Sequence, residues 1–138
     1  MMHYRLFFLG LLSLLSMGAT HLLAQTSRVQ RVEVPKDSLY RQTIDYLREH
    51  EFCIDCVDWQ SGFVKAKKYV ENDKLLSTSV GKRIELSIFV SPIDEAQSSL
   101  SLSIYCISLD KNPAFHQEGM CKDEKIYQSF IQGIISTE

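Results

Sequence analysis

Alternation of apolar and polar residues is the most regular pattern in this chain, and it predicts β-strands. Over residues 98–110, the apolar residues from Leu100 to Cys106 share one parity, whereas serines and Tyr105 take the other. Residues 82–91 repeat that period of two. A strand that alternates in this way has one covered face and one solvent-exposed face, as in antiparallel sheets.

Two other segments repeat their apolar residues with the period of an α-helix. The first follows Pro35, with Asp37 or Ser38 as the expected cap, and the second runs from residue 122 or 123 to residue 136. The stripe of the first segment consists of Leu39, Tyr40, Thr43, Ile44 and Leu47. The stripe of the second consists of Ile126, Tyr127, Phe130, Ile131 and Ile134. Each helix therefore has one apolar face to bury.

The order of these elements predicts a two-layer α+β domain with the sequence β-α-β-β-β-β-α. The expected strands span residues 28–34, 52–58, 63–70, 82–91 and 98–110, and a loop is expected from Lys111 to Met120. Helices and sheet each have a single apolar face, so both helices are expected to cover the same face of a five-stranded antiparallel sheet. Residues 25–138 then form a single domain.

The first 24 residues are typical of a secretory signal peptide. Arg5 supplies positive charge, and an uncharged run from Leu6 to Met17 follows it. The run is too short for a stable membrane anchor. Cleavage is expected near Ala24, with Ala19 as a competing position, and the mature protein is expected to be periplasmic or secreted. An uncleaved anchor or a buried helix is the alternative interpretation.

Composition and charge exclude several classes of function. The chain is 45% hydrophobic and has a formal net charge of −2. Arg5 is the only charged residue of the predicted leader, so its removal would take this charge to −3. Such a chain has no basic excess for nucleic acid, and nothing after residue 24 is apolar enough to span a bilayer. Phosphate-binding glycine loops and G-x-S-x-G motifs are absent from the sequence, and no cofactor is expected.

The stretch from Val32 to Lys67 resembles a family of small exported bacterial domains of unknown function with a TATA-binding-protein-like fold. It reads VEV, then KDSLYRQTIDYL, then an apolar strand, Asp58, Gly62 and FVKAK. The family shows a similar succession of signal peptide, short strand, helix with an "LY" start and a D-x-x-x-G hairpin. The resemblance implies a fold and an exported setting. It implies no activity and no site residue, and the four cysteines are outside the pattern.

Four cysteines in an exported chain favour disulfides. Cys106 is on the inward face of the last long strand and Cys121 precedes the helix that returns over the sheet, so a Cys106–Cys121 bridge is the favoured pairing. Cys53 and Cys56 are three apart on an expected strand, about 10 Å between Cα atoms, which excludes a local bridge. Cys56 shares the parity of the inward residues and is expected to be a buried thiol.

Redox and metal chemistry are the alternatives for these cysteines. Cys53 and Cys56 form a C-x-x-C pair, but the nearby carboxylates, such as Asp55 and Asp58, oppose a reactive thiolate. A zinc site built from all four cysteines would lack a second closely spaced pair, since Cys106 and Cys121 are far apart in the sequence. We therefore expect neither a metal nor a catalytic residue.

The outward face of the sheet is the candidate binding surface. Residues of outward parity on three neighbouring strands are Phe63, Lys65, Lys67, Tyr69, Phe89 and Tyr105. Aromatic rings beside lysines on a solvent-exposed sheet are typical of a partner-binding surface. The alternatives are that these residues only stabilise the sheet through cross-strand pairs, or that the segment from Glu71 to Gly81 or a second copy of the chain covers them.

These patterns predict an exported, non-enzymatic domain that binds a protein or an envelope component. A thiol-dependent enzyme or oxidoreductase that uses Cys53 and Cys56 is the alternative from a different class. A small inhibitor-type protein, with the loop from Lys111 to Met120 as its contact, is the third hypothesis.

Overall fold

The computed structural model describes residues 28–72 and 79–137. The predicted signal peptide, both candidate cleavage positions and the middle of the Glu71–Gly81 segment lie outside these ranges.

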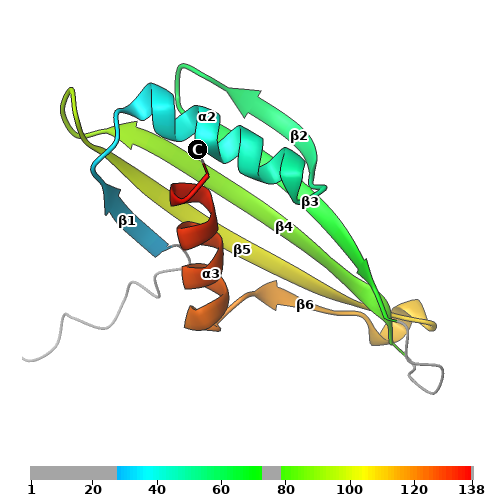
Figure 1. Cartoon of the computed structure of the whole chain (residues 1–138). Helices are drawn as coiled ribbons and strands as arrows, with labels where there is room; N and C mark the ends of the chain where they lie inside the picture. The colour runs from blue at the N-terminus through cyan, green and yellow to red at the C-terminus, as the bar shows by residue number, and fades with distance from the viewer. Residues whose placement is uncertain (1–27, 73–78, 138) are drawn as a thin grey trace, which may run out of the picture.

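One antiparallel sheet forms the centre of the described chain (Figure 1). Its strands are β1 (Arg28–Val32), β2 (Cys53–Asp58), β3 (Phe63–Glu71), β4 (Ser79–Pro92), β5 (Ser98–Asp110) and β6 (Gln117–Met120). The spatial order is β1-β5-β4-β3-β2, and β6 pairs with β5. The five predicted strands are present, and β6 is an additional short one.

The sixth strand lies within the segment predicted to be a loop. Residues Lys111 to Met120 contain a 3-10 turn, η1 (Pro113–Phe115), and β6. Along one edge of β5, β1 pairs with residues 98–102, whereas β6 pairs with residues 105–108 (Figure 1). Because β1 is short, β6 supplies hydrogen-bond partners to backbone groups of β5 that β1 does not reach.

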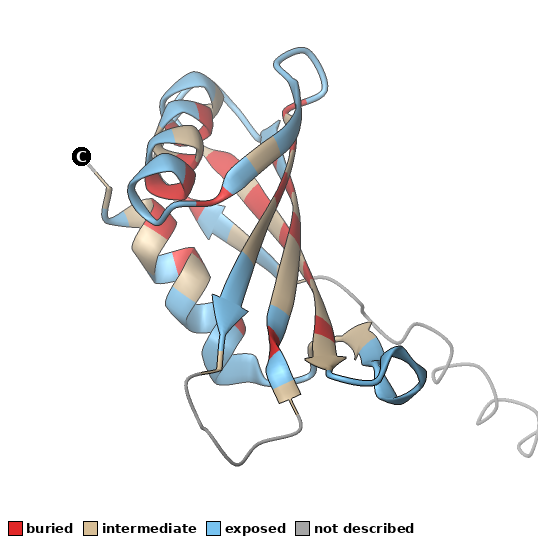
Figure 2. Ribbon diagram, turned by 90° about the vertical axis from the view of Figure 1, so that its right-hand side faces the viewer, coloured by how far each residue is buried: buried red, intermediate tan, exposed pale blue. Residues whose placement is uncertain are grey.

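Both helices cover the same face of the sheet, as the apolar stripes predict. In Figure 2, α2 (Lys36–Glu49) and α3 (Glu124–Ile135) lie on one side of the strands. The N-cap of α2 is Pro35, and no side chain caps it, so the predicted Asp37 or Ser38 cap is wrong. Asp123 caps α3 and accepts a hydrogen bond from the Lys125 amide. Within the described residues, neither helix has the length and apolarity to cross a membrane.

The core lies between the helices and the covered face. Its fully buried strand residues are Val64, Ala66, Leu86, Ile88, Val90, Leu100, Leu102 and Ile104. The helices contribute Leu39, Leu47, Tyr127, Ile131 and Ile134. These strand residues have the predicted inward parity. The helical stripes differ in detail, because Tyr46 is buried without having been predicted, whereas Ile126 is 38% exposed.

Candidate functional site: the open face of the sheet

Pairing between strands gathers the predicted surface residues on the face opposite the helices. Phe63 on β3 is directly across from Phe89 on β4, and Lys67 is across from Glu85, which in turn faces Tyr105 on β5. Lys65 and Tyr69 lie on the same face of β3, because they alternate with the buried Val64 and Ala66. All six predicted residues therefore share one face, which we call the open face.

An aromatic pair lies near one end of the open face. The ring centroids of Phe63 and Phe89 are 4.7 Å apart, with 40° between the ring planes. Phe89 is 45% exposed even in this contact, and Tyr69, further along β3, is 57% exposed. Ile88, the chain neighbour of Phe89, is fully buried. These rings are therefore exposed because they lie on the open face, whereas the next residue along the strand points into the core.

Charged side chains on the open face form pairs with one another. The Lys67 ammonium is 3.0 Å from a carboxylate oxygen of Asp55, and this hydrogen bond raises the pKa of Lys67. Arg83 Nε is 2.9 Å from Glu85 Oε1. A hydrogen bond with Tyr69 is the main cause that raises the pKa of Arg83. These pairs compensate the charges of Lys67, Asp55, Arg83 and Glu85 on this face.

Tyr105 lies between the centre of the open face and β6. Desolvation is the main cause that raises the pKa of its phenol, and the Glu118 carboxylate on β6 raises this pKa further. β6 thus extends the open face beyond β5 with Glu118 and Met120. Sequence reasoning missed this extension because it took residues 111–120 as a loop.

Cys56 lies on the open face, and its predicted burial is wrong. The pairing of β2 with β3 shifts between Ile54 and Cys56, so that Cys53 is opposite Lys67 and Cys56 is opposite Lys65. Such a β-bulge inserts one extra residue, here Asp55, and reverses the parity of every later position. Both thiols are therefore exposed. The apolar positions Phe52, Ile54 and Val57 break the period of two and are the sequence signal of the bulge.

Lysines, as well as carboxylates, surround this thiol pair. Lys65 and Lys67 are the cross-strand neighbours, and Lys67 neutralises Asp55. Cys53 Sγ is 4.0 Å from Asp55 Oδ1, at the limit for a sulfur hydrogen bond. The predicted environment of carboxylates alone is therefore incomplete, because the nearest cations come from β3.

Cys106 and Cys121 lie beside each other on the covered face, and the structure contains them as free thiols. The Cys121 amide donates to the Ile104 carbonyl at 2.8 Å, which continues the pairing of β6 with β5. Gly119 is directly opposite Cys106 and has no side chain. Burial raises the pKa of the Cys106 thiol, and the charge of Cys121 and a hydrogen bond with it raise it further. The structure brings the predicted pair together without bonding it.

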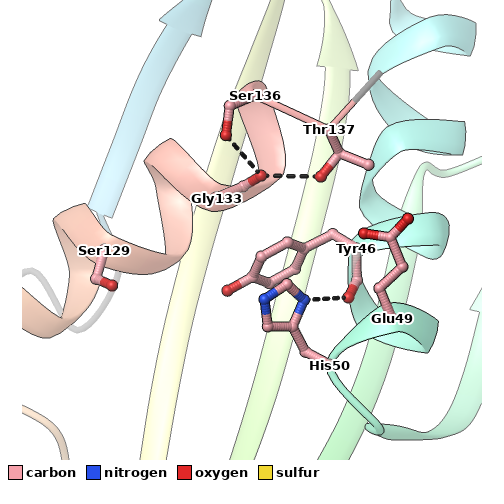
Figure 3. Close-up of a pocket in the computed structure, with 7 residues that line it drawn as sticks. All are labelled: Tyr46, Glu49, His50, Ser129, Gly133, Ser136 and Thr137. Atoms are coloured by element: carbon pink, nitrogen blue, oxygen red, sulfur yellow. Dashed lines mark hydrogen bonds between the residues drawn. The ribbon is translucent and has the colours of Figure 1, made fainter.

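Two depressions on the helical side were not predicted. One, of about 590 Å³, lies between α2 and β2 and is lined by Tyr40, Ile44, Arg48, Phe52, Ile54, Val57 and Trp59. The other, of about 460 Å³, lies where the C-terminal ends of α2 and α3 meet (Figure 3). There Tyr46 stacks on His50 with centroids 4.1 Å apart. Among the described residues, no group of three or more His, Cys, Asp or Glu side chains could hold a metal ion.

Comparisons with known proteins give similar structures only. No protein-family model and no curated protein sequence matches the chain. A TBP-like protein from Parabacteroides distasonis has a TM-score of 0.45 and 11% identity, over 84% of this chain and 97% of that one. A DUF4468 family protein from Bacteroides ovatus has a TM-score of 0.43 and 11% identity, over 70% of this chain and 63% of that one. These are proteins of the kind that the sequence resemblance indicated, and at this level of similarity they carry no argument about function.

Proposed function

We propose that this protein is an exported, non-enzymatic domain that binds a protein or an envelope component on its open face. The observation that carries the proposal is the Phe63–Phe89 pair, with Phe89 45% exposed on a face that neither described helix covers. Partly exposed aromatic rings gain free energy when a partner covers them, and they are enriched in protein interfaces.

The pairing of charges on the open face favours a partner that is recognised by its shape and by apolar contacts. Lys67 is paired with Asp55, and Arg83 is paired with Glu85. A surface that binds nucleic acid would instead present unpaired cations to the phosphates. The net charge of −2 points in the same direction.

The double variant Phe89→Ser with Tyr105→Ser tests this proposal. Both substitutions remove aromatic surface from the open face and leave the covered face intact. We expect crosslinking in the native envelope fraction to recover a partner with the unmodified protein and to lose it with the double variant. Thermal unfolding should change little. Unchanged capture, or a double variant that unfolds, would show that these rings only stabilise the sheet.

Phe115→Ser is the matched control, and it also tests the inhibitor-type alternative. Phe115 is 67% exposed in the turn between β5 and β6 and is the most exposed large hydrophobic residue described. Binding through the open face predicts that this variant captures the partner normally. Loss of capture with Phe115→Ser alone would assign binding to the segment from Lys111 to Met120.

We also propose that the exported protein carries a Cys106–Cys121 disulfide. A disulfide oxidant of the exporting compartment would take the two thiol hydrogens. The bridge would fasten the segment before α3 to β5 and would stabilise the fold by about 3 kcal/mol. A tryptic map without reduction should contain residues 84–111 linked to residues 112–122. Separate, alkylated peptides from the exported protein would contradict the bridge.

The intact mass of the exported protein would locate the proposed signal-peptide cleavage, at Ala24 or at Ala19.

A further inference from the structure

The β-bulge in β2 places two cysteines where a regular strand would separate them. Residues i and i+3 of a regular strand point to opposite faces, about 10 Å apart. Cys53 and Cys56 instead lie opposite Lys67 and Lys65, which are two residues apart on β3. Two residues span about 6.6 Å along a strand, and disulfides bridge Cα atoms up to about 6.8 Å apart. The bulge therefore turns both thiols to the same face and brings them closer together than a regular strand would.

We propose that Cys53 and Cys56 form a thiol–disulfide exchange site that reacts with anionic low-molecular-weight disulfides. Both thiols are exposed and free, and β2 is an edge strand that pairs on one side only. Asp55 has no partner residue across the bulge. The strand can therefore move slightly at this point without breaking hydrogen bonds to a second neighbouring strand.

Two lysines complete the site. Lys65 and Lys67 are the cross-strand neighbours of the two thiols, and Lys65 supplies positive charge that attracts an anionic disulfide. Lys67 also lies 3.0 Å from Asp55, which offsets the carboxylate beside Cys53.

The exchange has two balanced steps. One thiolate of the pair attacks a sulfur of oxidised glutathione, so that a mixed disulfide forms and one glutathione thiolate leaves. The second thiolate then attacks the protein sulfur of that mixed disulfide and expels the second glutathione. The pair loses two electrons and two protons, and one glutathione disulfide becomes two glutathione thiols.

Oxidised glutathione is the probe for the experiment on the folded full-length chain. Trypsin cleaves after Arg48 and Lys65, so both cysteines stay in the peptide of residues 49–65, whereas Cys106 and Cys121 fall in other peptides. After exchange, this peptide should lose two hydrogen masses and resist alkylation, and reduced glutathione should reverse both changes. Cys53→Ser or Cys56→Ser should instead retain one glutathione. A peptide with two glutathiones, or with two alkylated thiols, would overturn the proposal.

A matched variant keeps two cysteines in that peptide but moves one across the sheet. Val57 is opposite the fully buried Val64, so it lies on the helical side of the sheet, and it is 56% exposed. Cys56→Ser with Val57→Cys should therefore close at least about tenfold less than the natural pair. Equal closure by this variant would show that the disulfide reflects closeness in sequence alone. The site is independent of partner binding, so loss of capture in the envelope experiment leaves this expectation unchanged.

Discussion

Gly62 determines how closely the hairpin between β2 and β3 approaches strand β4. Its φ of +76° lies in the left-handed region that other residues adopt with strain. Its carbonyl accepts a hydrogen bond of 2.9 Å from the Val90 amide. A Cβ at this position would lie 2.0 Å from the Val90 carbonyl oxygen. Backbone conformation and space therefore both require glycine.

We predict that Gly62→Ala lowers the free energy of unfolding by at least about 2 kcal/mol, because strain and a backbone clash act together. Denaturation in urea, followed by circular dichroism, would measure the change. Gly119→Ala is the control, since nothing lies within 4 Å of a Cβ there. Equal effects of the two substitutions would contradict this account of Gly62.

Asp58 stabilises the same hairpin from its other end. Its carboxylate accepts hydrogen bonds from the Gln60 amide at 3.0 Å and from the Ser61 hydroxyl at 2.8 Å. The Ser61 hydrogen bonds are the main cause that lowers the pKa of Asp58. Asp58 and Gly62, two residues of the stretch that carries the family resemblance, are thus explained by the geometry of a turn.

At the scale of elements, a glycine fixes how closely the two helices approach. Gly133 of α3 faces the ring of Tyr46 on α2, and a Cβ there would lie 2.5 Å from a ring carbon. The ring has little freedom to move, since it stacks on His50 and has Phe130 at 6.3 Å between centroids. Small size, and not backbone conformation, is what this position requires.

We predict that Gly133→Ala destabilises the protein by up to about 2 kcal/mol. Overpacking of a buried ring typically costs about 1–3 kcal/mol, and the better helix propensity of alanine offsets about 1 kcal/mol of it. Urea denaturation would measure the difference. Gln132→Ala, at an exposed position of the same helix, controls for propensity. A more stable Gly133→Ala variant would mean that the Tyr46 ring moves aside into the depression of Figure 3.

The bulge of β2 decides which side chains of this strand lie on the open face. One inserted residue turns Cys56 from the covered face to the open face and turns Val57 the other way. Every later residue of the strand follows, because side chains alternate strictly along a strand. A local irregularity therefore decides which chemistry the open face can present.

At the scale of the whole molecule, one contact joins the start of the sheet to the last helix. Arg28, the first residue of β1, forms an ion pair with Glu124, the first residue of α3, with Nε 2.6 Å from Oε2. The hydrogen bond from Arg28 is the main cause that lowers the pKa of Glu124, and one from Gln128 adds to it. The pair connects segments 96 residues apart.

We predict that this pair contributes stability at neutral pH that is lost in acid. The folded-state pKa of Glu124 lies below its unfolded value, so the contribution is complete above the unfolded value and disappears as the pH falls through the folded one. Glu124→Gln should thus lower Tm slightly at neutral pH and converge with the unmodified protein in acid, once the pH falls below the folded-state pKa of Glu124. High salt should shrink the difference, because both side chains are partly exposed. A difference that persists in acid would mean that packing, and not charge, is responsible.

The layered architecture separates two roles of the sheet. The covered face is closed by α2 and α3, whereas the open face combines the Phe63–Phe89 pair with charged pairs between strands. Its six predicted residues were identifiable from parity alone, because each belongs to a regular stretch of strand. Whether they bind a partner depends on chemistry outside the fold, since a fold does not by itself define a function.

The sequence by itself determined the type and order of the main elements, the buried faces of β3, β4 and β5 and the single apolar side of each helix. These features follow from the spacing of apolar residues within short segments, so each segment can be interpreted without knowledge of its distant partners. Only the tertiary structure decided the pairing of β6 with β5, the approach of Cys106 to Cys121 and the need for a glycine at position 133. Each of these depends on a partner distant in the sequence, and no local pattern specifies where that partner lies.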